Sequence, residues 1–180
     1  MKPLRSLVAL MILSVTTFAA DTGGRDREGM PSPETDAYKS VRGFGGVLIV
    51  TPDKDWEEKW NTPANTTPKF TTTERLRVGE TLTILIFFSN AKASPQGGVQ
   101  VLCDIQLVRP NKTIAVDAKK ADCFTGQIQG DPLNVRLANP RLGFKGENSD
   151  ELGQYSVYVT LYDNVAGIAV PLKSIFTLDR

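Results

Sequence analysis

A period of two in the placement of apolar residues is the feature that most constrains the fold of this chain. It is clearest between residues 99 and 107, where one parity is apolar and the other is largely polar. The apolar set is Val99, Val101, Cys103, Ile105 and Leu107, and the polar set is Gln100, Asp104 and Gln106. Because successive side chains of a β-strand point to opposite faces, this period predicts a strand with one buried face.

Short segments of the same kind follow one another from residue 44 to the end of the chain, and turn-forming residues separate them. The segments are 46–50, 82–88, 99–107, 113–116, 133–137, 142–144, 155–161 and 168–178. Seven or eight short strands, almost without helix, predict an all-β antiparallel β-sandwich. We expect residues 44–180 to form one such domain.

Two of these segments also carry information about their place in a sheet. Leu82, Ile84 and Phe88 alternate with positions that include Leu85 and Phe87, so both faces are apolar and the strand is expected to be central. Pro171 in the last segment has no N–H to donate to a neighbouring strand. The last strand is therefore expected to lie at an edge or to carry a bulge at that point.

The chain contains two cysteines, Cys103 and Cys123. An even number of cysteines in an exported chain favours a structural disulfide, whereas a redox pair usually has the Cys-x-x-Cys spacing that is missing here. We therefore expect Cys103 and Cys123 to be bonded, with alpha carbons within roughly 7 Å of each other.

Two short motifs carry a further indication of the fold. Arg77 to Leu82 is a glycine turn that leads into a core strand, and Asp150 to Tyr155 combines acidic residues, a glycine and a tyrosine. They resemble motifs of bacterial exported immunoglobulin-like and fibronectin-like modules, in which a corner of the second kind precedes the penultimate strand. The resemblance implies an immunoglobulin-like β-sandwich in which Gly153 shapes the corner and the Tyr155 hydroxyl bonds to upstream backbone. Val157 stands where antibody domains have their second cysteine, so Cys103 is expected to reach a loop or edge strand instead.

The first 19 residues have the layout of a secretory signal peptide. Lys2 and Arg5 precede an apolar run, and Thr17 and Ala19 are the small residues expected before a cleavage site. Residues 20–43 are polar and contain glycine and proline, which favours a flexible leader. The mature protein is thus expected to be periplasmic or secreted.

The composition excludes several classes of function. The chain has 21 Lys and Arg residues against 20 Asp and Glu residues, and it has no histidine. The usual Ser-His-Asp and Cys-His arrangements are therefore excluded, and the commonest metal ligand is missing. No basic block attracts nucleic acid, and no stretch after the signal is long and apolar enough for membrane insertion. We expect neither a cofactor nor a bound metal.

Both tryptophans of the chain fall in the connection after the first strand. Thr51 can cap a short helix near residues 52–60 and Pro52 suits its first position, which places Trp56 and Trp60 on one face. One interpretation is that the pair closes an open end of the sandwich core. The alternative is a paired aromatic anchor for a partner protein, because Trp is enriched among binding hot spots.

Two tyrosines, Tyr158 and Tyr162, fall on the outward face of the strand that follows the corner. Tyrosine provides a large contact area with few torsions to restrain, which suits a binding face. Ordinary cross-strand pairing explains the same pattern equally well, so both interpretations stay open.

These observations predict an exported, non-catalytic binding or accessory module. Its partner would be another exported or envelope protein, contacted through a sheet face or edge. The alternative is a small-ligand carrier or a hydrolase with an unrecognised carboxylate site. Convergent buried acids in a deep pocket would favour the alternative, whereas a filled sandwich with surface aromatics would favour the module.

Overall fold

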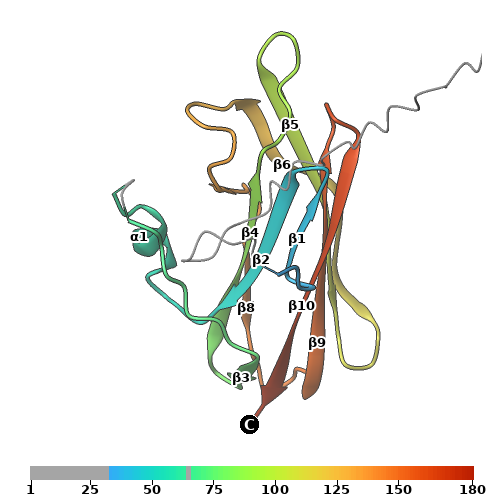
Figure 1. The fold of residues 1–180 in the computed structure, drawn as a ribbon. Coiled ribbons are helices and arrows are strands. Elements are labelled where there is room, and N and C mark those ends of the chain that lie inside the picture. Colours follow the sequence, from blue (N-terminus) through green and yellow to red (C-terminus); the bar gives the residue numbers. More distant parts are fainter. Residues whose placement is uncertain (1–32, 64–65) are drawn as a thin grey trace, which may run out of the picture.

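The computed structural model describes residues 33–63 and 66–180, and within them two β-sheets pack face to face (Figure 1). The predicted signal peptide and residues 20–32 of the predicted leader lie outside this part. The elements are β1 (Tyr38–Val41), β2 (Phe44–Thr51), α1 (Trp56–Trp60), β3 (Arg75–Arg77), β4 (Thr81–Ser89), β5 (Gly98–Val108), β6 (Ile114–Gln127), β7 (Arg136–Leu137), β8 (Leu142–Lys145), β9 (Gly153–Asp163) and β10 (Ile168–Asp179).

The first sheet has the order β1-β2-β4, and both β7 and β8 pair with the far side of β4. The second sheet has the order β3-β10-β9-β5-β6. All pairings are antiparallel except that of β3 with β10. The predicted all-β immunoglobulin-like sandwich is therefore confirmed. The described residues contain ten strands instead of seven or eight, and most of the surplus is very short.

The core lies between the sheets and is filled with apolar side chains. Strand β4 contributes Ile84 and Ile86 to it, and both are fully buried. The opposite parity of β4 is buried as well, because Leu85 is 0% and Phe87 is 2% exposed on the outer face. The expectation that this strand is central and buried on both faces is confirmed.

The hydrogen bond expected of the tyrosine corner is present. The Tyr155 hydroxyl donates to the backbone oxygen of Glu151 at 2.9 Å, while its ring stacks on Phe176 at a centroid distance of 5.2 Å. Gly153 has a φ of 128°, and a Cβ there would lie 3.2 Å from Pro110. A side chain at this position would thus meet both backbone strain and a close neighbour.

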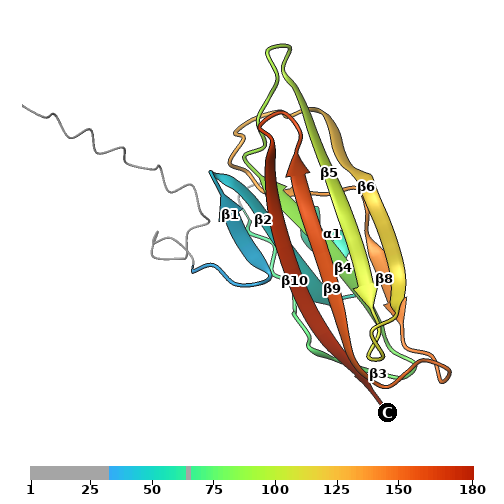
Figure 2. The same cartoon turned by 90° about the vertical axis from the view of Figure 1, so that its right-hand side faces the viewer.

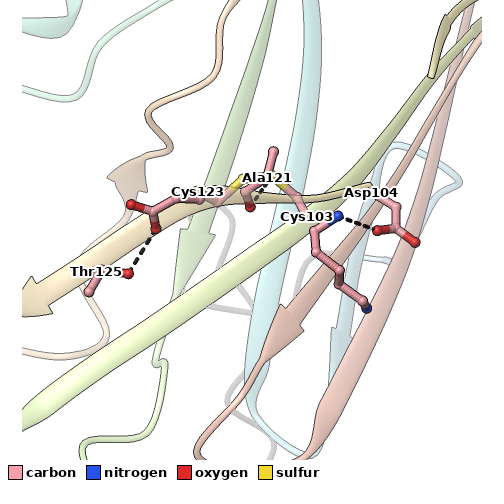
Figure 3. The surroundings of a disulfide bond; sticks show 7 residues. Cys103, Asp104, Ala121, Cys123 and Thr125 are labelled. Carbon is pink, nitrogen blue, oxygen red and sulfur yellow. Dashed lines mark hydrogen bonds between the residues drawn. A yellow bond between two sulfur atoms is a disulfide. The ribbon is translucent and has the colours of Figure 1, made fainter. Parts of the chain in front are cut away.

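The predicted disulfide between Cys103 and Cys123 is formed, with a Cα–Cα distance of 5.9 Å (Figure 3). It joins β5 to β6, which is an edge strand of the second sheet. Both cysteines are fully buried. The bond therefore ties an edge strand to its neighbour instead of linking the two sheets. This agrees with the expectation drawn from Val157, which stands where antibody domains have the second cysteine of their inter-sheet disulfide.

Pro171 occupies an open part of the β10 edge. The N–H of Lys173, two residues further on, points away from β9 and donates to the Asp36 oxygen at 2.7 Å. Residues of the same parity share that direction in a strand, so the missing N–H of Pro171 costs no bond to β9. Strand β3 pairs with β10 only from Thr177 onward, so near Pro171 the edge of β10 is free of β3 and is available to Asp36.

Part of the segment predicted as a leader belongs to the first sheet. Strand β1 pairs antiparallel with β2, with Tyr38 opposite Val47 and Val41 opposite Phe44. The ordered sheet thus begins before residue 44. Polar composition alone did not reveal this strand, because an edge strand that is only half-buried needs few apolar residues.

The strand predicted over residues 133–137 is mostly a loop. The side chain of Asp131 accepts a hydrogen bond from the Leu133 N–H at 2.9 Å, and the Asn134 N–H donates to the Asp131 backbone oxygen. This turn replaces strand pairing until Arg136. Leu133 and Val135 are consequently 53% and 51% exposed.

The described part of the chain contains no helix of a length and apolarity that would let it cross a membrane. The five-residue helix α1 is its only α-helix.

Replacing Tyr155 by Phe removes the corner hydrogen bond and keeps the ring. We expect a loss of about 1 kcal/mol in the free energy of unfolding, measured by denaturant titration. The matched control is Tyr158→Phe on the same strand, which should change stability by less than about 0.5 kcal/mol. Equal effects of the two changes would contradict the role of the corner.

Removing the disulfide with the double change Cys103→Ala and Cys123→Ala should lower the free energy of unfolding by about 3 kcal/mol, because the unfolded chain gains loop entropy. Reduction of the unchanged protein should have a comparable effect. Two free thiols detected by mass after alkylation without reductant would show that the bond does not form in the protein.

Candidate functional site

The four candidate contact residues lie on the two opposite outer faces of the sandwich. Trp56 and Trp60 belong to residues 52–63 and 66–74, here named the strap, which lies against the outer side of the first sheet (Figure 1). Tyr158 and Tyr162 lie on β9 in the second sheet. The structure therefore offers two separate surfaces.

The strap covers the apolar outer face of β4. The Trp60 and Phe70 rings lie on the Phe87 ring, at centroid distances of 5.2 Å and 5.7 Å. This explains how Phe87 is buried although it points away from the main core. Trp60 therefore covers the outer face of a sheet. The interpretation that the tryptophans close an open end of the core is wrong, because Trp60 lies on a face of the sandwich and not at its end.

The helix of the strap starts later than predicted. It spans Trp56–Trp60 with Asp55 at the N-cap, and no side chain caps it. Thr51 is the last residue of β2, and its hydroxyl accepts a hydrogen bond from the Asp53 N–H at 3.1 Å. The threonine thus terminates a strand in a local turn instead of capping a helix.

Asp53 clamps the two ends of the strap together. Its carboxylate accepts a bond from the Thr71 N–H at 2.8 Å and pairs with Lys59 Nζ at 2.8 Å. Burial acts to raise the pKa of Asp53, but the bonds from Lys59 and Thr71 lower it by more, so this pKa is about 2 instead of 3.8. The bond to Asp53 likewise raises the pKa of Lys59.

Trp56 makes a different ring contact from Trp60. Its ring lies 5.5 Å from the Arg141 guanidinium carbon, a cation–π arrangement at the rim of the strap. Both tryptophans are half-buried, and α1 contains no fully buried residue. Trp60 therefore covers β4, whereas Trp56 contacts Arg141, and both residues stay partly open to solvent.

The outer face of the second sheet is not covered by any described segment (Figure 2). Tyr158 lies near its centre, opposite Gln106 of β5 and Lys173 of β10. Tyr158 is 41% exposed, with Lys173 Nζ 5.8 Å from the centroid of its ring. Gln106 Nε2 donates to Asp117 at 3.1 Å. We call these residues, together with Asp104, Lys120 and Tyr162, the β9 face.

Tyr162 is held more rigidly than Tyr158. Its hydroxyl donates to Asp104 Oδ2 at 3.0 Å, and Lys120 Nζ lies 2.9 Å from its ring centroid. The Lys120 N–H donates to Asp104 Oδ1 at 2.8 Å (Figure 3). These three residues form a connected cluster in which the tyrosine ring is covered by a cation, so Tyr158 is the more accessible ring.

A β-bulge creates this cluster. The register between β5 and β6 shifts around Asp104, and Lys120 adopts a φ of 51°. The alternation of β5 placed Asp104 on the outer face, but it gave no indication that Lys120 would reach back over the sheet. The predicted return strand ended near residue 116, whereas β6 continues to Gln127.

The carboxylates of the β9 face are stabilised in their charged form. The Lys120 N–H lowers the pKa of Asp104, assisted by the Tyr162 hydroxyl and nearby lysines and opposed by burial. The hydrogen bonds from Gln106 and Lys119 lower the pKa of Asp117. Paired carboxylates of lowered pKa suit ion pairing better than proton transfer near neutral pH. In residues 33–63 and 66–180 no three His, Cys, Asp or Glu side chains come together as metal ligands would.

No protein-family model and no curated protein matches the chain. Among solved structures it is similar to a family 123 glycoside hydrolase from Clostridium perfringens, with 11% identity and a TM-score of 0.42 over 75% of this chain and 27% of that one. It is also similar to a Niemann-Pick type C2 protein from the Japanese carpenter ant, with 8% identity, a TM-score of 0.39 and coverage of 79% and 91%.

A third similar structure is the CARDB domain of the PF1109 protein from Pyrococcus furiosus, with 10% identity, a TM-score of 0.37 and coverage of 74% and 89%. The chain spans 27% of the length of the glycoside hydrolase, and 29% and 46% of two further similar structures, a DNA glycosylase from Pseudomonas fluorescens and a sporulation control protein from Bacillus subtilis. At such low similarity none of these proteins informs the activity of this chain.

Both tryptophans lie in the strap, so tryptophan fluorescence reports on the strap alone. Asp53→Ala should shift the emission to the red at neutral pH, because the strap loosens and the rings gain solvent, with a loss of global stability below about 1 kcal/mol. Asp36→Ala, which removes the ion pair between Asp36 and Lys39 outside the strap, is the control and should leave the spectrum unchanged. An unchanged spectrum for Asp53→Ala would contradict the clamp.

The same emission should depend on pH in a defined window. The pKa of Asp53 is depressed, so the stabilisation is fully present above pH 3.8 and is lost as the pH falls through about 2. We expect the red shift in that range, with the far-ultraviolet circular dichroism of the sheets followed in parallel. A red shift centred at pH 5 or above would contradict the ion pair.

Proposed function

We propose that the protein is an exported, non-catalytic binding module that contacts another exported or envelope protein through the β9 face. The observation that carries this proposal is the position of Tyr158. It is 41% exposed at the centre of a sheet face that no described segment covers. The other sheet, by contrast, uses its own strap to cover its outer face.

The chemistry around Tyr158 suits a protein partner. A tyrosine ring combines a large apolar surface with a polar hydroxyl at little entropic cost, and such residues are frequent at the centre of binding sites. Asp104 and Asp117 already have partners on the face. A partner therefore need not separate a buried ion pair in order to reach Tyr158.

The filled core supports a module over a carrier or hydrolase. The buried polar residues of the described part are Thr51 and Asp163. Asp163 accepts hydrogen bonds from the N–H groups of Lys92, Val165 and Ala166. A single buried carboxylate with this many backbone donors stabilises turns, and it has no second acid beside it to form a catalytic pair.

The proposed location outside the cytoplasm rests on two features. The disulfide is of the kind that persists in oxidising compartments. The first 19 residues have the layout of a signal peptide. The immunoglobulin-like fold is compatible with an extracellular location.

The proposal is tested by crosslinking the mature chain in a periplasmic extract and then measuring the affinity for the protein that is identified. Tyr158→Ala should weaken binding at least about tenfold, as expected of a central hot spot, with less than about 0.5 kcal/mol change in stability. Lys145→Ala on β8, an exposed change outside the β9 face, is the control and should leave affinity unchanged.

Trp56→Ala separates the two surfaces. It should leave the affinity unchanged if the β9 face is the contact. Loss of binding in Trp56→Ala but not in Tyr158→Ala would move the contact to the strap and overturn the proposal.

A further inference from the structure

A second surface lies at the end of the sandwich where three turns meet, which is the upper end in Figures 1 and 2. These turns connect β1 to β2, β4 to β5, and β9 to β10. Between them is a pocket of about 390 Å³, here named the loop-end pocket. Its lining residues are Arg42, Asn90, Lys92, Asp163, Ala166 and Ile168.

Hydrogen bonds hold the walls of the loop-end pocket in place. The buried Asp163 carboxylate accepts bonds from the Lys92 N–H at 2.8 Å and from the Ala166 N–H at 2.9 Å, which ties the β4–β5 turn to the β9–β10 turn. The Asn90 side chain donates to the Gly43 oxygen at 3.0 Å and so adds the β1–β2 turn. A pocket formed in this way loses little conformational entropy when it binds.

Two residues of the pocket adopt left-handed backbone conformations. Arg42 has a φ of 49° and Asn90 a φ of 56°. Asparagine tolerates this region, but arginine does so less readily, and Asn-Gly is the preferred pair in a tight hairpin turn of this kind. Strained residues of this sort gather at functional sites. An arginine in this strained position therefore agrees with a binding role for its guanidinium group.

The charges of the pocket favour an anion. Arg42 and Lys92 have no carboxylate partner among the described residues, and Arg42 makes only a long 3.4 Å bond to the Gly167 oxygen. The one carboxylate in the lining, Asp163, is 1% exposed and points at backbone N–H groups. The lining therefore contains two exposed cationic residues against one buried carboxylate.

The loop after β6, which holds the exposed apolar residues here named the rim, contacts the pocket residue Asn90. The Asn90 N–H donates to the Pro132 oxygen at 2.7 Å, which brings the loop after β6 to the pocket. The neighbouring Leu133 and Val135 are 53% and 51% exposed. A small inorganic anion would use only the charges, whereas a peptide can place a carboxylate in the pocket and an apolar side chain on the rim.

We propose that the loop-end pocket binds a glutamate or aspartate side chain of a peptide segment, with the apolar residues beside that acid resting on Leu133 and Val135. The Arg42 guanidinium and the Lys92 ammonium would donate to the carboxylate. This site is independent of the β9 face, which lies on the flank of the sandwich.

The probe is a pair of matched peptides, acetyl-Leu-Glu-Leu-amide and acetyl-Leu-Gln-Leu-amide, titrated into the ¹⁵N-labelled mature protein. The glutamate peptide should produce saturable shifts in the amides of Gly43, Lys92 and Ala166. The glutamine peptide should bind at least about tenfold more weakly, as expected for loss of a charge-assisted contact. Added salt should weaken the binding of the glutamate peptide.

Two variants test the cations separately. Arg42→Asn keeps a residue suited to the left-handed turn, and Lys92→Met keeps a side chain of similar length. Each change should weaken the binding of the glutamate peptide at least about fivefold. Lys145→Met, which removes a cation from β8, is the matched control and should have no effect.

Three results would overturn the proposal. The first is equal affinity for the two peptides. The second is an equal response to sodium acetate at the same concentration, which would indicate a simple anion site. The third is a set of shifts around Tyr158 in place of the turns, which would assign the peptide to the β9 face and leave the loop-end pocket without a ligand.

Discussion

The burial of β4 on both of its faces is the constraint on which the rest of the structure depends. Its inner side chains, Ile84 and Ile86, pack between the sheets, which obliges the second sheet to lie opposite. Its outer side chains, Leu85 and Phe87, would expose apolar surface if nothing covered them. The strap is therefore an integral part of the fold, and the Asp53 clamp keeps it against β4.

The use of the strap on one sheet leaves the two outer faces with different roles. The first sheet has an apolar outer strip and covers it with half-buried aromatic rings. The second sheet has a polar outer face, where Asp104 bonds to the Tyr162 hydroxyl, Lys120 covers the Tyr162 ring and Tyr158 stays accessible. A polar face needs no cover to stay in water, and it is here that we place the proposed partner contact.

The disulfide and the bulge of β6 act together at the edge of the second sheet. Cys123 fixes the strand to β5, while the bulge at Lys120 turns a lysine over the sheet face. Bulges and charged residues also protect an exposed edge from pairing with other chains. The same irregularity thus shapes the β9 face and limits edge-to-edge association.

Local patterns in the sequence determined the strand period, the central position of β4, the corner at Tyr155 and the pairing of two cysteines, because each depends on near neighbours or on a simple parity. The placement of Trp60 on Phe87, of Lys120 over Tyr162, and of Arg42 beside Lys92 was decided by the tertiary structure. These residues are far apart in the chain or lie at a bulge or turn. Only the packing of the two sheets, and the turns between them, brings such side chains together.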